Sequence, residues 1–201
     1  MLHDLGAERP AAKKRDDRID RIVATLDAKA AEFLNVPKPH GQFLNLMVKA
    51  TRARRVLEIG TAHGYCTIWM ALGLEETGGR LVTLEILPER VDLAKKHVAE
   101  AGLSPRVTFK RGNAHELVSA LGGMFDFVLV DADKDGVMDY FEKLYPKKLE
   151  SGALLLVHGA IQLRDQMNDY LEMIARHPDF DTVILTARMD EGFAASYRKR
   201  V

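Results

Sequence analysis

A short turn that begins with a carboxylate and contains two glycines is the first part of the sequence with the residue types to bind a ligand. It reads EIGTAHGY, from Glu58 to Tyr65. Gly60 and Gly64 have no Cβ, so they allow a bound molecule to approach the backbone closely, although both also suit a simple tight turn. The dinucleotide fingerprint G-x-G-x-x-G requires glycine where Ala62 and Tyr65 stand. The turn therefore indicates a ligand site that is not a dinucleotide site.

A second carboxylate favours a ligand that contains a nucleoside. Glu85 ends the next apolar run of the chain, where nucleotide-binding α/β folds use an acidic residue to accept hydrogen bonds from a ribose diol. A solvated charge at a strand end is the alternative, but Gly60 and Glu85 in register favour the ribose. Asn113, Ala114 and His115 follow the third apolar run, where an adenine edge would lie.

The sign of these charges favours S-adenosylmethionine over a dinucleotide. S-adenosylmethionine carries a positive sulfonium and an ammonium group and no phosphate. A dinucleotide brings a pyrophosphate, which Glu58 would repel. We therefore interpret the turn as part of a methyl-donor site, and an NAD(P)-dependent oxidoreductase on a related sheet is the alternative from another class of enzyme.

The composition fits a soluble protein that acts on a small molecule. The chain has 201 residues, enough to bury a sizeable core, and Lys+Arg and Asp+Glu both total 29, so that the net charge is zero. A nucleic-acid-binding protein usually has a basic excess, so no nucleic acid is expected as a partner. The single cysteine excludes an internal disulfide. With no stretch of about 20 apolar residues, we expect no membrane partner and a cytoplasmic location.

The order of the apolar runs predicts an α/β fold. Short apolar runs alternate with helical segments from residue 55 onward, which is typical of a mostly parallel sheet with helices on both faces. The expected strands are residues 56–59, 81–84, 107–109, 125–130, 153–157, 182–186 and 193–198. The expected helices are residues 65–75, 89–101, 114–121, 136–148 and 162–176. A short turn with Gly192 separates the last two runs, so we expect them to form an antiparallel hairpin.

A helical segment, residues 1–52, is expected to precede the α/β core, residues 53–201, within a single domain. The residues through about Asp16 are polar and are interpreted as a frayed lead-in. Apolar residues at helical spacing predict a helix over residues 19–33, and two prolines then interrupt the pattern. A second amphipathic helix is expected over residues 43–50.

The turn, Glu85 and the segment DADK at residues 131–134 together resemble the cation-dependent O-methyltransferases of the catechol and caffeoyl-CoA type. The likeness covers residues 39–199. It implies the Rossmann-like class I methyltransferase fold, with a seven-stranded sheet that ends in a hairpin. It also implies a homodimer, and methyl transfer to an oxygen of a small, hydroxylated aromatic acceptor.

The resemblance assigns roles to the residues around the cofactor. It implies that Glu85 binds the ribose, that Gly60 lies beside the methionine part and that Ala114 and His115 lie near the adenine. Tyr65 either contacts the cofactor or packs in the core. The predicted cofactor-binding residues are Glu58, Gly60, Gly64, Tyr65, Glu85, Asn113, Ala114, His115 and Asp131.

The cation site that the resemblance implies is incomplete in this chain. In the family, the residue matching Asp131 helps to hold a divalent cation, and the lysine matching Lys134 is the expected general base. The family carries Asp-Asn at the end of the fifth strand, where this chain has His158 and Gly159. Mg²⁺ requires oxygen ligands in an octahedral array. Asp131 with an imidazole would better suit Zn²⁺, Fe²⁺ or Mn²⁺.

Three interpretations of the acceptor half of the site follow. In the first, which we favour, the enzyme needs no metal and uses Lys134 or His158 as the catalytic base. In the second, Asp131 and His158 hold a transition metal. In the third, the protein binds the cofactor without catalysing a reaction. A histidine that is simply hydrogen-bonded at a strand end is the structural alternative for His158.

Overall fold

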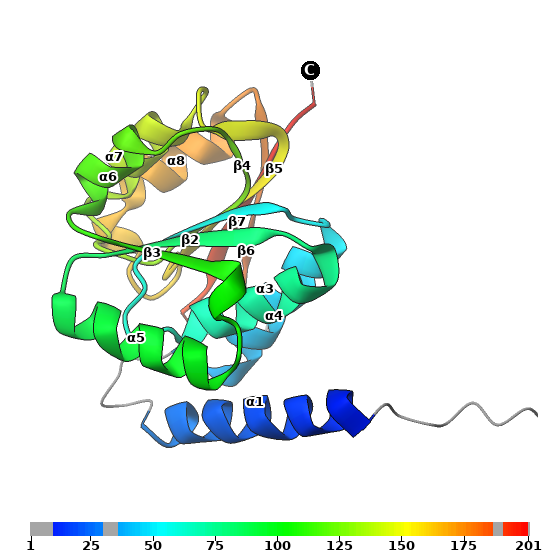
Figure 1. The fold of residues 1–201 in the computed structure, drawn as a ribbon. Coiled ribbons are helices and arrows are strands. Elements are labelled where there is room, and N and C mark those ends of the chain that lie inside the picture. The colour runs from blue at the N-terminus through cyan, green and yellow to red at the C-terminus, as the bar shows by residue number, and fades with distance from the viewer. Residues whose placement is uncertain (1–9, 30–35, 187–190, 201) are drawn as a thin grey trace, which may run out of the picture.

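Helices and strands alternate along most of the chain. The computed structural model describes residues 10–29, 36–186 and 191–200, and Figure 1 gives their arrangement. The helices are α1 (Pro10–Ala28), α3 (Lys38–Ala50), α4 (Tyr65–Thr77), α5 (Pro88–Glu100), α6 (Ala114–Ala120), α7 (Val137–Leu144) and α8 (Asn168–Arg176). The strands are β1 (Arg55–Ile59), β2 (Arg80–Glu85), β3 (Val107–Arg111), β4 (Phe125–Val130), β5 (Leu149–His158), β6 (Phe180–Leu185) and β7 (Phe193–Arg198).

The strands form one seven-stranded sheet in the order β3-β2-β1-β4-β5-β7-β6. The pairs β1–β2, β1–β4, β2–β3 and β4–β5 are parallel. β7 lies antiparallel between β5 and β6, which confirms the predicted C-terminal hairpin. The strand order reverses between β1 and β4, and parallel α/β sheets bind ligands beyond the carboxyl ends of the strands at such a reversal.

Helices cover both faces of the sheet, as the sequence predicts. Figure 1 shows α6, α7 and α8 on one face and α3, α4 and α5 on the other. Successive residues of a strand point to opposite faces, so Leu57 packs with α6, α7 and α8, while Val56 packs with α3 and α4. The helix α1 packs against α4 and α5 through Ile19, Val23 and Leu26. Among the described residues, no helix is long and apolar enough to span a membrane.

Several predicted boundaries are wrong. The helix α1 begins at Pro10, within the predicted lead-in, because proline suits the first turn of a helix. It ends at Ala28, and residues 30–33 of the predicted helix lie outside the described residues. The helix predicted over residues 136–148 ends at Leu144, because Pro146 cannot continue a helix.

Two other segments differ from the prediction in length. The helix predicted over residues 162–176 is divided into a 3-10 turn, Arg164–Gln166, and α8, because Met167 between them, with φ −132° and ψ 24°, is not helical. The strand β5 begins at Leu149, before the predicted residue 153, because Leu149 pairs with Phe125 of β4 ahead of an irregularity in the ladder.

Close contact between α3 and α4 depends on glycine. A Cβ at Gly41 would lie 2.1 Å from the Cδ1 atom of Trp69, and one at Gly73 would lie 2.8 Å from the Cγ1 atom of Val48. These glycines let the two helices approach, and this approach places His40, in the first turn of α3, against the end of the sheet.

We predict that Gly41→Ala lowers the free energy of unfolding by about 2 kcal/mol, because the clash with Trp69 exceeds the gain in helix propensity. Urea unfolding followed by circular dichroism measures the change. Gly122→Ala is the matched control, since no atom lies within 4 Å of the position its Cβ would take. An equal effect of both substitutions would contradict the packing argument.

Candidate active site

A cavity of about 910 Å³ opens at the carboxyl ends of the central strands. Six of the nine predicted cofactor-binding residues line it, namely Gly60, Tyr65, Glu85, Asn113, Ala114 and Asp131. Both predicted catalytic residues, Lys134 and His158, line it as well. The cavity thus brings together residues at or just after the carboxyl ends of five strands, β1 to β5.

The first turn is pressed against the end of β4, and this contact requires glycine. Gly60 has a φ of +97°, and a Cβ on it would lie 2.2 Å from the backbone oxygen of Asp131. The backbone N–H of Asp131 donates to the carbonyl of Ile59 at 2.8 Å. The turn and the end of β4 therefore form one continuous wall of the cavity.

Glu85 is held in place by backbone donors. Its Oε2 accepts a hydrogen bond from Ala62 N–H at 2.9 Å. Its Oε1 accepts hydrogen bonds from Ile86 and Leu87 at 2.9 and 3.0 Å. The carboxylate is thus fixed on the cavity wall, and the remaining lone pair of Oε2 can accept a hydrogen bond from a ribose hydroxyl.

Glu58 lies beneath the turn and does not line the cavity. Its side chain is fully buried, and its Oε2 accepts hydrogen bonds from Thr67 at 2.5 Å and Thr83 at 2.6 Å. Burial raises the pKa of Glu58 to about 8, against the lowering by these two hydroxyls. The geometry gives Glu58 a role in supporting the turn rather than the predicted direct contact with the cofactor.

Gly64 and His115 also lie outside the cavity lining. Gly64 has a φ of +86° at the start of α4, where a Cβ would lie 3.1 Å from the Cβ of Ala94 on α5. His115 stacks on Tyr140, with ring centroids 4.2 Å apart, and its Nε2 lies 3.1 Å from Asp133 Oδ2. Gly64 therefore allows close packing of α4 and α5, and His115 holds Asp133 of the DADK segment in place.

Two of the lining residues also join parts of the fold. The hydroxyl of Tyr65 donates to Asp27 Oδ1 at 2.7 Å, which connects α4 to α1. Asn113 caps α6, because its Oδ1 accepts from His115 N–H at 3.0 Å. Tyr65 therefore packs in the core and also lines the cavity, and its contact with the cofactor stays a prediction.

The part of the cavity at the ends of β4 and β5 is organised around the carboxylate of Asp131. Its Oδ1 lies 2.8 Å from Lys134 Nζ and 3.0 Å from His158 Nδ1. The other ring nitrogen of His158 lies 2.9 Å from Glu191 Oε2 and 3.2 Å from His40 Nδ1. One imidazole therefore connects two carboxylates that lie on opposite sides of it.

These charges change the protonation of the cluster. Burial would raise the pKa of Asp131, but the charges and hydrogen bonds of His158 and Lys134 hold it well below its usual range. Burial would lower the pKa of His158, but Asp131 and Glu191 raise it to about 9. The hydrogen bond from His158 lowers the pKa of Glu191. At neutral pH, with this raised pKa, His158 is therefore an imidazolium.

His40 and Glu191 also belong to this cluster, and the sequence analysis did not select either as a site residue. The first lies in α3 and the second in the turn before β7, far from the other site residues along the chain. No local motif marks either residue. The only sequence signal is topological, since Glu191 lies just before a strand that pairs with the end of β5.

The residues present do not fit the Mg²⁺ site that the resemblance implies. Two of its three oxygen ligands are replaced by the nitrogen of His158 and by Gly159, which has no side chain. Asp131 Oδ1 already receives both Lys134 and His158. Mg²⁺ prefers an octahedron of oxygen atoms, so this arrangement does not provide a site for it.

The strand order, the terminal hairpin and a cavity beyond β1, β2 and β4 define the class I methyltransferase fold. The sequence model of the family described as O-methyltransferase matches residues 12–187. The chain belongs to this family, as the resemblance predicts.

Known proteins agree with this assignment. A catechol O-methyltransferase of Mycobacterium tuberculosis is 33% identical over 182 residues, which cover 85% of this chain and 82% of that protein. One from Niastella koreensis is 35% identical over 131 residues, 63% of this chain and 59% of that protein, so the chain spans less than two thirds of it. The crystal structure of an O-methyltransferase from Bacillus cereus with S-adenosylhomocysteine has a TM-score of 0.80 and 28% identity, with 91% of each chain covered.

We predict that Glu58 makes stability depend on pH. A carboxyl whose pKa is raised on folding destabilises the folded state once the pH exceeds its unfolded value of 4.5. Between pH 5 and 8, the folded protein should therefore lose about 1.4 kcal/mol per pH unit relative to Glu58→Gln. Urea unfolding of the cofactor-free protein at several pH values measures this difference.

Glu142→Gln is the matched control for this measurement, because Glu142 is exposed on α7. The difference between this variant and the unsubstituted protein should stay constant over the same pH range. A constant difference for Glu58→Gln as well would contradict a raised pKa at this residue.

Proposed function

We propose that this protein transfers the methyl group of S-adenosylmethionine to a hydroxyl oxygen of a small aromatic acceptor, and that it does so without Mg²⁺. The observation that carries the proposal is a single cavity, with Glu85 fixed on one wall and Lys134 on another. Membership of the O-methyltransferase family supports the reaction type. The catechol O-methyltransferase relative supports an aromatic diol as acceptor.

The methyl donor fits the half of the cavity between the first turn and α6. Glu85 accepts hydrogen bonds from the ribose, and Asn113 and Ala114 line the space for the adenine. The methionine part lies beside Gly60, and the carboxylate of Asp131 attracts its ammonium group. The relative from Bacillus cereus, in complex with S-adenosylhomocysteine, supports this choice of cofactor.

Methyl transfer is an in-line displacement at a carbon that the sulfonium already activates. A lone pair of the acceptor oxygen forms the new C–O bond, the C–S bond breaks, and its electron pair stays on sulfur. The hydroxyl proton must pass to a base in the cavity. The enzyme therefore has to orient the hydroxyl and take its proton.

We assign the base to Lys134, whose ammonium group, paired with Asp131, first releases a proton to solvent so that the neutral amine can accept the hydroxyl proton. Its side chain is buried at the cavity wall, and Asp131 orients its Nζ. Both ring nitrogens of His158 already lie within hydrogen-bonding distance of carboxylates, so neither is directed at an acceptor hydroxyl. His158 is therefore a positioning residue for Asp131. Gly159, Gln162 and Leu163 line the acceptor side.

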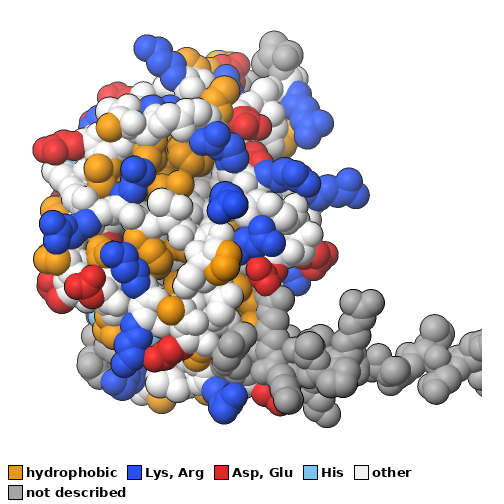
Figure 2. Space-filling model, viewed as in Figure 1, with side chains coloured by type: hydrophobic (Ala, Val, Ile, Leu, Met, Phe, Trp, Pro, Cys, Tyr) orange, Lys and Arg blue, Asp and Glu red, His pale blue; other side chains and the backbone are white. Residues whose placement is uncertain are grey.

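We also propose that residues 1–201 form a single domain, and that the protein works in the cytoplasm as a homodimer and binds no nucleic acid. The balanced charge supports the last point, since basic and acidic side chains are interspersed over the face in Figure 2. The edge strand β6 carries exposed Val183 and Ile184, which supports a covered edge in a dimer. Sedimentation equilibrium measures the oligomeric state.

We predict that Glu85→Gln weakens the binding of S-adenosylhomocysteine by about 10- to 100-fold, because a charged acceptor of the ribose hydroxyls is lost. Isothermal titration calorimetry measures the dissociation constant. Glu89→Gln, an exposed change in the first turn of α5, is the control and should bind as the unsubstituted protein does. Equal affinities of Glu85→Gln, Glu89→Gln and the unsubstituted protein would contradict a role of Glu85 in cofactor binding.

We expect Lys134→Met to reduce kcat by about 10²- to 10⁴-fold while it still binds S-adenosylhomocysteine, because the base is lost and the donor contacts stay. A radiolabelled methyl donor measures transfer to catechols, flavonoids and hydroxycinnamoyl thioesters. Lys147→Met, at an exposed position, is the control and should keep full activity.

Mg²⁺ added after chelation should leave the rate with the best of these acceptors unchanged. A rate that rises with Mg²⁺ would contradict the proposed Mg²⁺ independence. No transfer to any of the three acceptor classes would contradict the proposed acceptor.

A further inference from the structure

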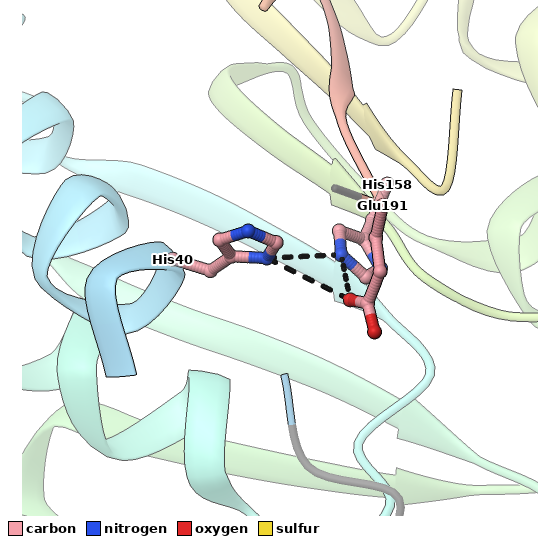
Figure 3. Close-up of side chains that lie close together, drawn as sticks. All are labelled: His40, His158 and Glu191. Atoms are coloured by element: carbon pink, nitrogen blue, oxygen red, sulfur yellow. Dashed lines mark hydrogen bonds and ion pairs between the residues drawn. The ribbon is translucent and has the colours of Figure 1, made fainter. Parts of the chain in front are cut away.

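Three potential metal ligands from distant parts of the chain meet at the acceptor side of the cavity. They are His40 at the start of α3, His158 at the end of β5 and Glu191 before β7. Figure 3 shows the three side chains pointing toward one another. His40 is fully buried and His158 nearly so, while Glu191 is partly exposed and lines the cavity with His158.

We propose that His40, His158 and Glu191 form a binding site for a divalent transition-metal ion such as Zn²⁺. The facing atoms are His40 Nδ1, His158 Nε2 and Glu191 Oε2. His158 Nε2 lies 3.2 Å from His40 Nδ1 and 2.9 Å from Glu191 Oε2, and the last two atoms are 3.7 Å apart. An ion with bonds of about 2.0–2.2 Å separates its ligand atoms by about 3–3.5 Å. The three atoms therefore need only small shifts to surround one ion.

The surroundings of His158 prepare it for this role. Its Nδ1 lies 3.0 Å from Asp131 Oδ1, so the carboxylate holds a proton on that nitrogen and directs Nε2 toward the other two ligands. A carboxylate behind a ligating imidazole is a general feature of metal sites, where it fixes the orientation of the ring. Phe193 contacts both imidazoles, with ring centroids 5.3 and 4.9 Å away, and shields them.

The ligand set determines the class of metal. Two imidazoles and one carboxylate suit Zn²⁺, Fe²⁺, Co²⁺ and Mn²⁺, whereas Mg²⁺ prefers oxygen ligands. The site is distinct from the Mg²⁺ site rejected above, because it uses the Nε2 side of His158 and not Asp131. Three protein ligands leave a coordination position open, as in catalytic zinc sites. The exposed side of Glu191 puts this position next to the cavity.

If the proposed methyl transfer is correct, the open position lies on the acceptor side, where a metal ion orients a hydroxyl and lowers its pKa. This last step rests on the proposed function. The metal site itself rests only on the geometry of the three ligands. Metal binding is therefore measured without donor or acceptor, so that failure of either idea is recognised separately.

Calorimetry with the full chain tests the site. Tag-free protein is treated with EDTA, passed through a desalting column and titrated with ZnCl₂, CoCl₂ and MgCl₂. We expect one Zn²⁺ or Co²⁺ per chain with a dissociation constant of about 1 µM or below. The visible absorption of bound Co²⁺ should indicate nitrogen and oxygen ligands, and Mg²⁺ at millimolar concentration should give no heat of binding.

Variants connect this binding to the three residues. His40→Ala and Glu191→Gln should each weaken Zn²⁺ binding by about 100-fold or more. Glu191 lies in a turn and is partly exposed, so Glu191→Gln keeps the test valid if His40→Ala does not fold. His177→Gln is the control, because His177 lies near Phe180, at the opposite end of the hairpin from Phe193, and should bind as the unsubstituted protein does.

Two results would overturn the proposal. One is the absence of stoichiometric Zn²⁺ and Co²⁺ binding below about 100 µM. The other is binding that Glu191→Gln and His177→Gln weaken equally. Methyl transfer that resists chelation, together with tight Zn²⁺ binding, would leave the site in place and reject only its part in the reaction.

Discussion

The site depends on Asp131, which joins its two halves. The backbone of this residue faces the cofactor side, where its N–H donates to Ile59 and its carbonyl presses on Gly60. Its carboxylate faces the acceptor side and receives both Lys134 and His158. Because one residue makes both sets of contacts, the end of β4 fixes the position of the Gly60 turn relative to Lys134 and His158. The positive charges around its carboxylate keep it ionised despite its burial.

Local patterns in the sequence predict the cofactor half well. Each strand of the sheet is a short apolar run, and the turn from Gly60 and the acidic end of β2 at Glu85 follow such runs directly. The parallel order then brings Glu85, Asn113 and Asp131 to one edge. These patterns did not distinguish residues that line the cavity from residues that support its wall from beneath. Glu58 has the residue type of a ligand-binding group, but it lies beneath the turn, where the hydroxyls of Thr67 and Thr83 donate to its Oε2.

The acceptor half could not be predicted in the same way, because its residues meet only in the folded chain. His40 reaches the site through the glycine contacts of α3 with α4, and Glu191 through the pairing of β7 with β5. No periodic pattern in the local sequence predicts either of these two contacts. Residues 158–159 could be recognised as a departure from the family, but the partners that His158 gains could not. The helix boundaries failed for different reasons: Pro146 is a local signal that could have ended α7 in the prediction, whereas nothing in the sequence marks the non-helical backbone of Met167.

The replacement of an oxygen ligand by His158 changes more than the choice of metal. A carboxylate at this position would present acceptors only, whereas an imidazole has two nitrogens that point in opposite directions. One nitrogen is bound to Asp131, so the other must find a partner on the far side, where Glu191 and His40 supply it. In the family the cation lies beside the residue matching Asp131. In this chain the position open to a proton or to the proposed metal ion is at Nε2 of His158, next to Glu191. The donor half does not take part in this change, because backbone hydrogen bonds rather than these side chains hold Glu85 and the first turn. The fold can therefore keep its methyl donor while the means of activating the acceptor changes.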